Sequence, residues 1–196
     1  MLKLSALGGA VLGLLAVRLL QPMAQLLFAA HMAQHLLLIA IVAPLLVLAG
    51  LEIRLPPLTG WGLFIAVFLF WHWPVLFRWA AQQPYGELLE LGSILAAACC
   101  FWSGVLALGG LNDGARALMV MTAAILTDLP GVVMLFSPVA FCTMPAENAA
   151  RFGLTPLSDQ QLAGLLMWVP ANMVFFSIAT FLFARWIGAH HRPVTP

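Results

Sequence analysis

Charged side chains are scarce in this 196-residue chain, which has eight Lys or Arg and seven Asp or Glu, together 8% of the sequence. Soluble globular proteins carry about 25% charged residues, so the composition excludes an ordinary soluble domain. With a net charge of +1, the chain also lacks a basic patch for nucleic acid. Its three cysteines, Cys99, Cys100 and Cys142, form no framework of spaced pairs, which excludes a disulfide scaffold.

Long apolar runs are what the chain has instead. Hydrophobic residues make up 63% of it, and several uncharged stretches exceed the ~18 residues that mark a membrane-spanning helix. The sequence therefore predicts an all-α, polytopic transmembrane bundle with Pro-kinked helices, forming a single integral membrane domain over residues 1–196. Six spans are expected, or five if the first segment does not span: Leu4–Leu20, Pro22–Ala49, Gly60–Ala80, Glu87–Leu108, Arg116–Ser137 and Ser158–Ile187.

The basic residues predict how the bundle is oriented in the bilayer. With six spans, five of the eight Lys and Arg residues fall on the side of both termini. Because Lys and Arg gather on the cytoplasmic side of a membrane, both termini are expected in the cytoplasm. The longest polar loop, residues 142–158, is then expected on the outer face.

Among the ionisable side chains of the expected spans, four stand out: His31, His35, His72 and Asp128. Such groups cost about 2.5–3.5 kcal/mol in a bilayer core, so they face the bundle interior and mark functional sites. His31 and His35 lie four residues apart, on one helix face, and this spacing suits two ligands of one metal ion. Counted by helix rise, all four can occupy one layer of the membrane. For the lone His72, a hydrogen bond to a backbone carbonyl is an equally good interpretation.

Sulfur-bearing side chains fall in the same half of the expected bundle. Met134 and Met167 lie near the side away from the termini, and Cys142 and Met144 lie at its surface. Imidazole with thioether or thiolate nearby suits copper(I), and zinc less well. Asp128 is expected to orient a metal-binding histidine without binding the metal itself, or to carry a proton released when metal binds.

Other functions are also open on these residues. A haem-binding or electron-transfer protein needs one imidazole on each face of the porphyrin, which His72 could supply with either His31 or His35. An ion or proton transporter would use Asp128 and the histidines as a relay. No enzyme activity is expected, because "HMAQH" has Met32 where the zinc-protease motif His-Glu-x-x-His has its general base.

Three motifs, "HMAQHLLLIAIVAPLLVLAG", "WHWPVLF" and "LSDQQLAGLLMWVP", together resemble the CtaG-type cytochrome c oxidase assembly factors of bacterial membranes. By this resemblance His31 and His35 correspond to the family's paired histidines, and His72 to the histidine of its Trp-His-x-Pro-like element. A further histidine that family members often carry is replaced by Leu91.

The resemblance also implies a role in respiratory chain biogenesis. The chain is expected to be a metallochaperone that binds copper(I) within the membrane near the outer face and delivers it to the catalytic subunit of a haem–copper oxidase. Its primary ligands would be His31, His35 and His72. Its implied partners are that subunit, a periplasmic copper donor protein and the lipid bilayer, and its implied location is the bacterial inner membrane.

Overall fold

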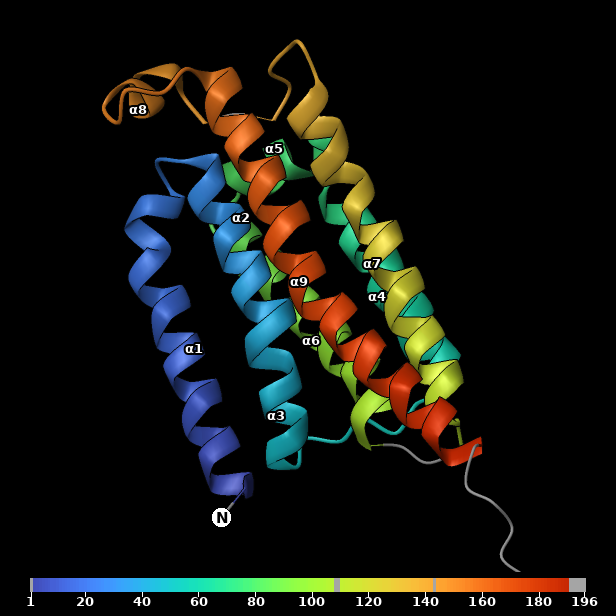
Figure 1. The fold of residues 1–196 in the computed structure, drawn as a ribbon. Coiled ribbons are helices and arrows are strands. Elements are labelled where there is room, and N and C mark those ends of the chain that lie inside the picture. The colour runs from blue at the N-terminus through green and yellow to red at the C-terminus, as the bar shows by residue number, and fades with distance from the viewer. Residues whose placement is uncertain (1, 108–109, 143, 191–196) are drawn as a thin grey trace, which may run out of the picture.

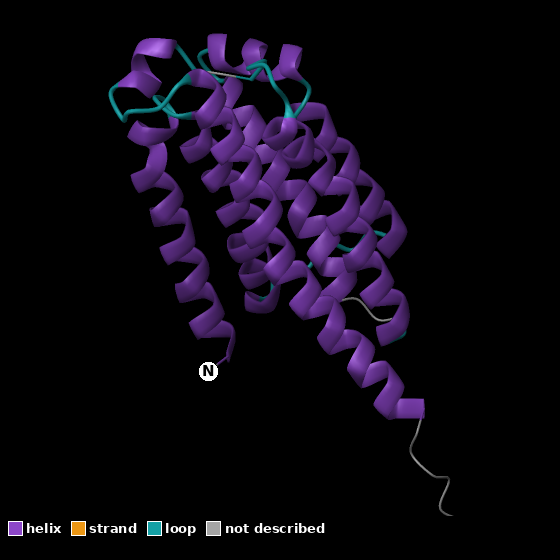
Figure 2. Ribbon diagram, turned by 45° about the horizontal axis from the view of Figure 1, so that its top comes forward, coloured by secondary structure: helices purple, strands orange, loops and turns teal. Residues whose placement is uncertain are grey.

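The long apolar runs of the sequence form the helices of the structure. The computed structural model describes residues 2–107, 110–142 and 144–190, and these residues form helices and loops without a strand (Figure 2). Two segments, η1 and η2, are π-helical and the rest are α-helices. Their bounds are α1 (Leu2–Ala24), α2 (Phe28–Leu37), η1 (Leu38–Val42), α3 (Ala43–Ala49), α4 (Pro57–Trp71), α5 (Pro74–Gln82), α6 (Gly86–Trp102), η2 (Ser103–Ala107), α7 (Asp113–Phe136), α8 (Ala146–Ala150) and α9 (Pro156–His190).

Within the described residues, five helical stretches are long and apolar enough to cross a membrane, and the bent pair α4 and α5 would make a sixth span. The helices run side by side, with the start of α1 and the end of α9 at one end of the bundle and α8 at the other (Figure 1). The prediction of an all-α, multi-pass membrane protein is therefore confirmed.

The third expected span, Gly60–Ala80, is bent rather than continuous. Helix α4 ends at Trp71, α5 begins at Pro74, and their axes differ by 73°. Pro74 has no N–H to continue the helix, and its ring crowds the preceding turn. The Phe70 carbonyl accepts a hydrogen bond from the Trp73 N–H at 3.2 Å instead. The break leaves His72 between the two helices, at the wall of the bundle core.

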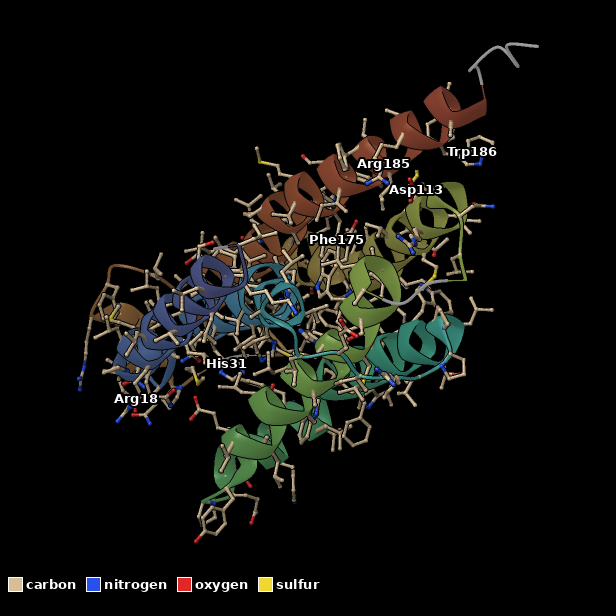
Figure 3. All side chains as sticks on the ribbon, turned by 90° about the horizontal axis from the view of Figure 1, so that it is seen from below. Arg18, His31, Asp113, Phe175, Arg185 and Trp186 are labelled. Atoms are coloured by element: carbon tan, nitrogen blue, oxygen red, sulfur yellow. The ribbon has the colours of Figure 1, made fainter. Side chains whose placement is uncertain are left out.

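Helices α7 and α9 approach each other closely where two glycines meet. A Cβ atom built on Gly164 would lie 2.5 Å from the Gly131 carbonyl oxygen and 2.8 Å from the Leu135 nitrogen. Small residues of this kind let the backbones of membrane helices touch. At the terminal end of the same pair, Arg185 Nε lies 3.1 Å from Asp113 Oδ2 (Figure 3).

Replacing Gly164 with Ala is expected to destabilise the bundle by about 1–3 kcal/mol, the usual cost of overpacking a well-packed contact. Thermal unfolding in detergent measures this loss. Gly62→Ala is the matched control, because a Cβ atom at Gly62 meets no other atom within 4 Å. Equal unfolding temperatures for the two variants would show that the α7–α9 contact tolerates a methyl group.

The polar stretch of residues 142–158 contains α8 and ends inside the first turn of α9. That helix begins at Pro156, two residues before the predicted start at Ser158. Thr155 and Ser158 cap it reciprocally: the Thr155 N–H donates to Ser158 Oγ at 2.8 Å, and the Ser158 N–H donates to Thr155 Oγ1 at 3.1 Å. Because these two residues provide the cap, the following Asp159 and Gln160 are left to bind other segments.

Candidate metal centre

Helix α2 is held in place by a carboxylate from α9. Asp159, 1% exposed, accepts hydrogen bonds from the backbone N–H groups of Phe28 at 2.8 Å and Ala29 at 3.0 Å. These N–H groups belong to the first two residues of α2 and have no hydrogen-bond acceptor within the helix itself. A negative charge also suits the positive end of the helix dipole. Asp159 thus fixes the first turn of the helix that carries both paired histidines.

His31 and His35 lie on the buried face of α2. The two residues are 4% and 2% exposed, and their ring centroids are 4.7 Å apart. Figure 3 shows His31 inside the bundle. The sequence prediction that the two imidazoles share one helix face agrees with this geometry.

A third side chain, Glu90 of α6, meets both histidines. Its Oε1 atom lies 3.2 Å from His31 Nε2 and 3.3 Å from His35 Nε2, and the residue is 2% exposed. Ser93 supports this turn of α6: it accepts a hydrogen bond from Trp71 Nε1 at 2.7 Å and donates one to the Glu90 carbonyl at 3.1 Å. The carboxylate is therefore positioned from the end of α4 as well as by its own helix.

The distances among these three side chains suit a shared metal ion. Ligand atoms at about 2.0–2.1 Å from a tetrahedral ion are about 3.3 Å apart, close to the two nitrogen–oxygen distances. One ligand atom from each residue lies within 4.8 Å of those of the other two. Both ring nitrogens of His35 are buried and make no hydrogen bond to the described residues. His35 Nε2 faces Glu90 Oε1 at 3.3 Å, an arrangement in which both atoms can bind the same ion.

His72 approaches the centre from the break between α4 and α5. Its ring centroid is 5.3 Å from that of His35, and its Nδ1 lies 2.7 Å from the Phe68 carbonyl oxygen. A carbonyl only accepts hydrogen bonds, so Nδ1 carries the proton and Nε2 has a free lone pair. That Nε2 is buried without a hydrogen-bond partner among the described residues. A ring held in this tautomer is ready to bind metal, although His72 lies outside the three-residue group above.

Two of the other predicted site residues line cavities next to the centre. Met144 lines a cavity together with His31 and Glu90, and Met167 lines a smaller one together with His35. Met134 is buried between α7 and α9, where its carbonyl accepts a hydrogen bond from Gln160 at 3.2 Å.

Cys142 and Asp128 are held by neighbours other than the histidines. The Cys142 N–H donates to Gln160 Oε1 at 2.9 Å, and burial raises the pKa of its thiol to about 11. The thiol is therefore neutral at pH 7 and a poorer ligand than a thiolate. Asp128 Oδ2 accepts a hydrogen bond from Asn172 Nδ2 at 2.8 Å, between α7 and α9.

The model of the family described as cytochrome c oxidase caa3 assembly factor (Caa3_CtaG) matches residues 5–189 of this sequence. The chain belongs to this family. A search of curated proteins and a search of solved structures each returned no match. The resemblance recognised from the three sequence motifs is confirmed, and membership in an assembly factor family implies a role other than catalysis.

Glu90 is the residue of this assembly factor's centre that the sequence did not identify. It stands next to Leu91, where the resemblance leads one to expect a histidine, and at the edge of an expected span, where a charged residue is unremarkable. One feature of the sequence could have identified Glu90: it lies three residues after Glu87, on the same face of the helix. A carboxylate one turn inside an apolar helix needs a partner, and the paired histidines are that partner.

Removing the Asp159 carboxylate should weaken both the fold and the centre of this assembly factor. Asp159→Ala leaves two N–H groups at the start of α2 without an acceptor, which costs about 2–5 kcal/mol and loosens the turn before His31. The temperature of thermal unfolding in detergent should therefore fall below that of wild type. Gln161→Ala, in the same turn of α9, is the control. A variant as stable as wild type would show that Asp159 does not hold α2.

Proposed function

We propose that this assembly factor binds copper(I) at His31, His35 and Glu90 and delivers it to the catalytic subunit of a haem–copper oxidase. The observation that carries the proposal is one buried carboxylate oxygen 3.2 and 3.3 Å from two imidazole nitrogens, in a chain of a cytochrome c oxidase assembly family. Copper is the cargo of this centre, and delivery makes or breaks no bond in a substrate.

The charge of the donor set favours a monovalent ion. Two neutral imidazoles and one carboxylate carry a single negative charge, which one copper(I) ion balances. A divalent ion such as zinc would leave a net positive charge among fully buried side chains, and unbalanced charge away from water is costly. Imidazole is a good ligand for copper, so the two histidines and the charge of the site both support copper(I).

His72 is proposed as a fourth ligand, and the methionines as exchange ligands. The lone pair of His72 Nε2 is buried next to His35, so a small movement of the ring would bring it to the ion. Met144 and Met167 lie on the two cavities that adjoin the centre. Thioethers bind copper(I) as soft neutral ligands, which suits them to replace an imidazole during transfer.

The proposed setting is the inner membrane of a bacterium, with both termini in the cytoplasm. Helix α2 begins at the end of the bundle away from the start of α1 (Figure 1), so this orientation puts the centre near the outer face. A periplasmic donor protein would load it there, and the oxidase subunit would take the ion from it.

The structure favours copper over the haem alternative. The space beside His35 is about 30 Å³, whereas pockets for small molecules and cofactors measure about 300–1,000 Å³. The larger cavity at the centre, about 340 Å³, is lined by only one of the three histidines, His31. The rings of His35 and His72 are also already in contact, with centroids 5.3 Å apart. A porphyrin between these imidazoles would need the helices to separate.

Copper transfer between purified proteins tests the proposal. The assembly factor, loaded anaerobically with copper(I), is mixed with oxidase catalytic subunit that lacks copper, both in detergent. After separation, the oxidase subunit should contain copper and the assembly factor should have lost it. Copper that stays with the assembly factor, or a Soret band in its absorption spectrum as purified, would contradict the proposed function.

A further inference from the structure

A cavity of about 340 Å³ leads from the protein surface to the candidate metal centre. His31 and Glu90, both buried, line its inner part, whereas Ala81 and Gln83, both exposed, line its outer part. Its walls come from the end of α1, the end of α5, the turn into α6 and the segment before α8. The cavity therefore opens at the end of the bundle away from the start of α1.

The lining of this cavity is suited to a soft cation. Glu87 and Glu90, one helical turn apart on α6, both contribute to it, and no Lys or Arg is found among its described lining residues. Two carboxylates on a narrow passage attract cations. Met144 contributes the sulfur of the lining, and a thioether binds copper(I) while it holds hard cations only weakly.

Hydrogen bonds hold Glu87 in the wall of the cavity. Gln21 Nε2 donates to Glu87 Oε1 at 2.6 Å. The buried Gln34 in turn donates to Gln21 Oε1 at 3.0 Å and to the Val17 carbonyl at 2.9 Å. This chain of amides connects α1, α2 and α6, so the carboxylate has a fixed place beside the route to Glu90.

The segment that carries Met144 is also fixed. Gln160, fully buried on α9, accepts hydrogen bonds through Oε1 from the Phe141 N–H at 2.7 Å and the Cys142 N–H at 2.9 Å. Its Nε2 donates to the carbonyls of Met134 and Val139. Adjacent residues of α9 thus hold both walls: Asp159 holds the start of α2, and Gln160 holds the segment leading to Met144.

We infer that copper(I) enters and leaves the centre through this cavity, with the Met144 thioether as a transient ligand on the way. The inference rests on the proposed function and adds the route and the chemistry of the partner. A donor protein presents copper(I) at the opening, Met144 sulfur displaces one of the donor's ligands, and His31 Nε2 then displaces the sulfur. The ion keeps its single charge throughout, so no electron donor or acceptor is needed.

Plugging the cavity tests this route. A Gln83→Cys variant is labelled at the new thiol either with a methylthio group or with a bulky fluorescein maleimide, and is then loaded from a copper(I) chelator complex. The bulky label should slow loading about tenfold or more relative to the small one, with the same final copper content. The native Cys99, Cys100 and Cys142 are buried, so the labels are directed to residue 83.

Arg151→Cys, exposed beyond α8 and outside the cavity lining, is the positional control. The bulky label there should leave the loading rate unchanged. If fluorescein at residue 83 slows loading no more than it does at residue 151, copper enters elsewhere and the route is wrong, while copper binding itself stands. If wild-type protein takes up no copper, the proposed function fails, and the route with it.

Met144→Leu tests the transient ligand separately. Leu keeps the size and removes the sulfur, so loading should slow several-fold while the equilibrium affinity stays that of wild type. Met173→Leu, on the exposed surface of α9, is the control and should load normally. A lower equilibrium affinity in Met144→Leu would make Met144 a resident ligand, and an unchanged rate would remove it from the route; either result overturns its role as a transient ligand.

Discussion

The His31→Gln/His35→Gln variant is expected to bind no measurable copper(I), against about one ion per chain for wild type. Both imidazole nitrogens that face the Glu90 carboxylate are lost, and a carboxylate alone is a poor ligand for a soft ion. Gln is chosen because its side-chain amide can still donate a hydrogen bond to Glu90, so the buried carboxylate keeps a partner and the fold is preserved. Metal analysis after anaerobic loading and gel filtration measures the result.

His190→Ala is the control for this variant, because His190 ends α9 at the other end of the bundle from the start of α2. It should retain the wild-type copper content. Circular dichroism and elution volume show whether the double variant is folded. A folded double variant that still binds copper with wild-type stoichiometry would show that His31 and His35 are not the ligands.

Glu90→Gln is expected to weaken copper(I) binding by at least about 10–100-fold. This is the usual cost of losing a residue that only hydrogen-bonds to a metal ligand, and Glu90 is proposed as a ligand itself. The substitution keeps the shape of the side chain and removes its charge. A bound copper(I) ion would then bring an unbalanced positive charge into the buried site. Competition with a colorimetric copper(I) chelator measures the affinity.

Asp128→Asn is the matched substitution at an acidic residue of the bundle that lies outside the candidate metal centre. Because the hydrogen-bond partner of Asp128 is Asn172, and Asp128 is not part of the His31, His35 and Glu90 group, its neutralisation should leave the copper(I) affinity within a few-fold of wild type. The opposite pattern, with Asp128→Asn severe and Glu90→Gln silent, would favour the relay of an ion or proton transporter.

The sequence predicts the long helices of this protein well, since each is an apolar run of sufficient length. One boundary was wrong: the second span was predicted to begin at Pro22, but Pro22 lies within α1 and α2 begins at Phe28. The sequence also predicts that His31 and His35 share a helix face, because four residues make about one turn. These are local properties, which depend on residues near one another in the chain. Pro-kinked helices were also predicted, but the angle of 73° between α4 and α5 is set by packing between helices and could not be derived from the sequence.

The contacts of Glu90 and Asp159 could not be predicted, for a different reason. Glu90 meets His31 across 59 positions of sequence, and Asp159 meets Phe28 across 131. Contacts of this kind depend on which helices are neighbours and how far each is shifted along its axis. The stretch "LSDQQ" illustrates the difference: Ser158 makes a local capping interaction with Thr155, whereas the neighbouring Asp159 binds the start of another helix.

The most direct test of the central claim is copper K-edge X-ray absorption of the purified, anaerobically loaded wild-type protein. The expected result is a copper(I) edge, scattering from imidazole rings, and a first shell of nitrogen and oxygen at about 2.0 Å. A first shell dominated by sulfur at about 2.3 Å would place the ion on methionine or cysteine, and would contradict a resting site at His31, His35 and Glu90.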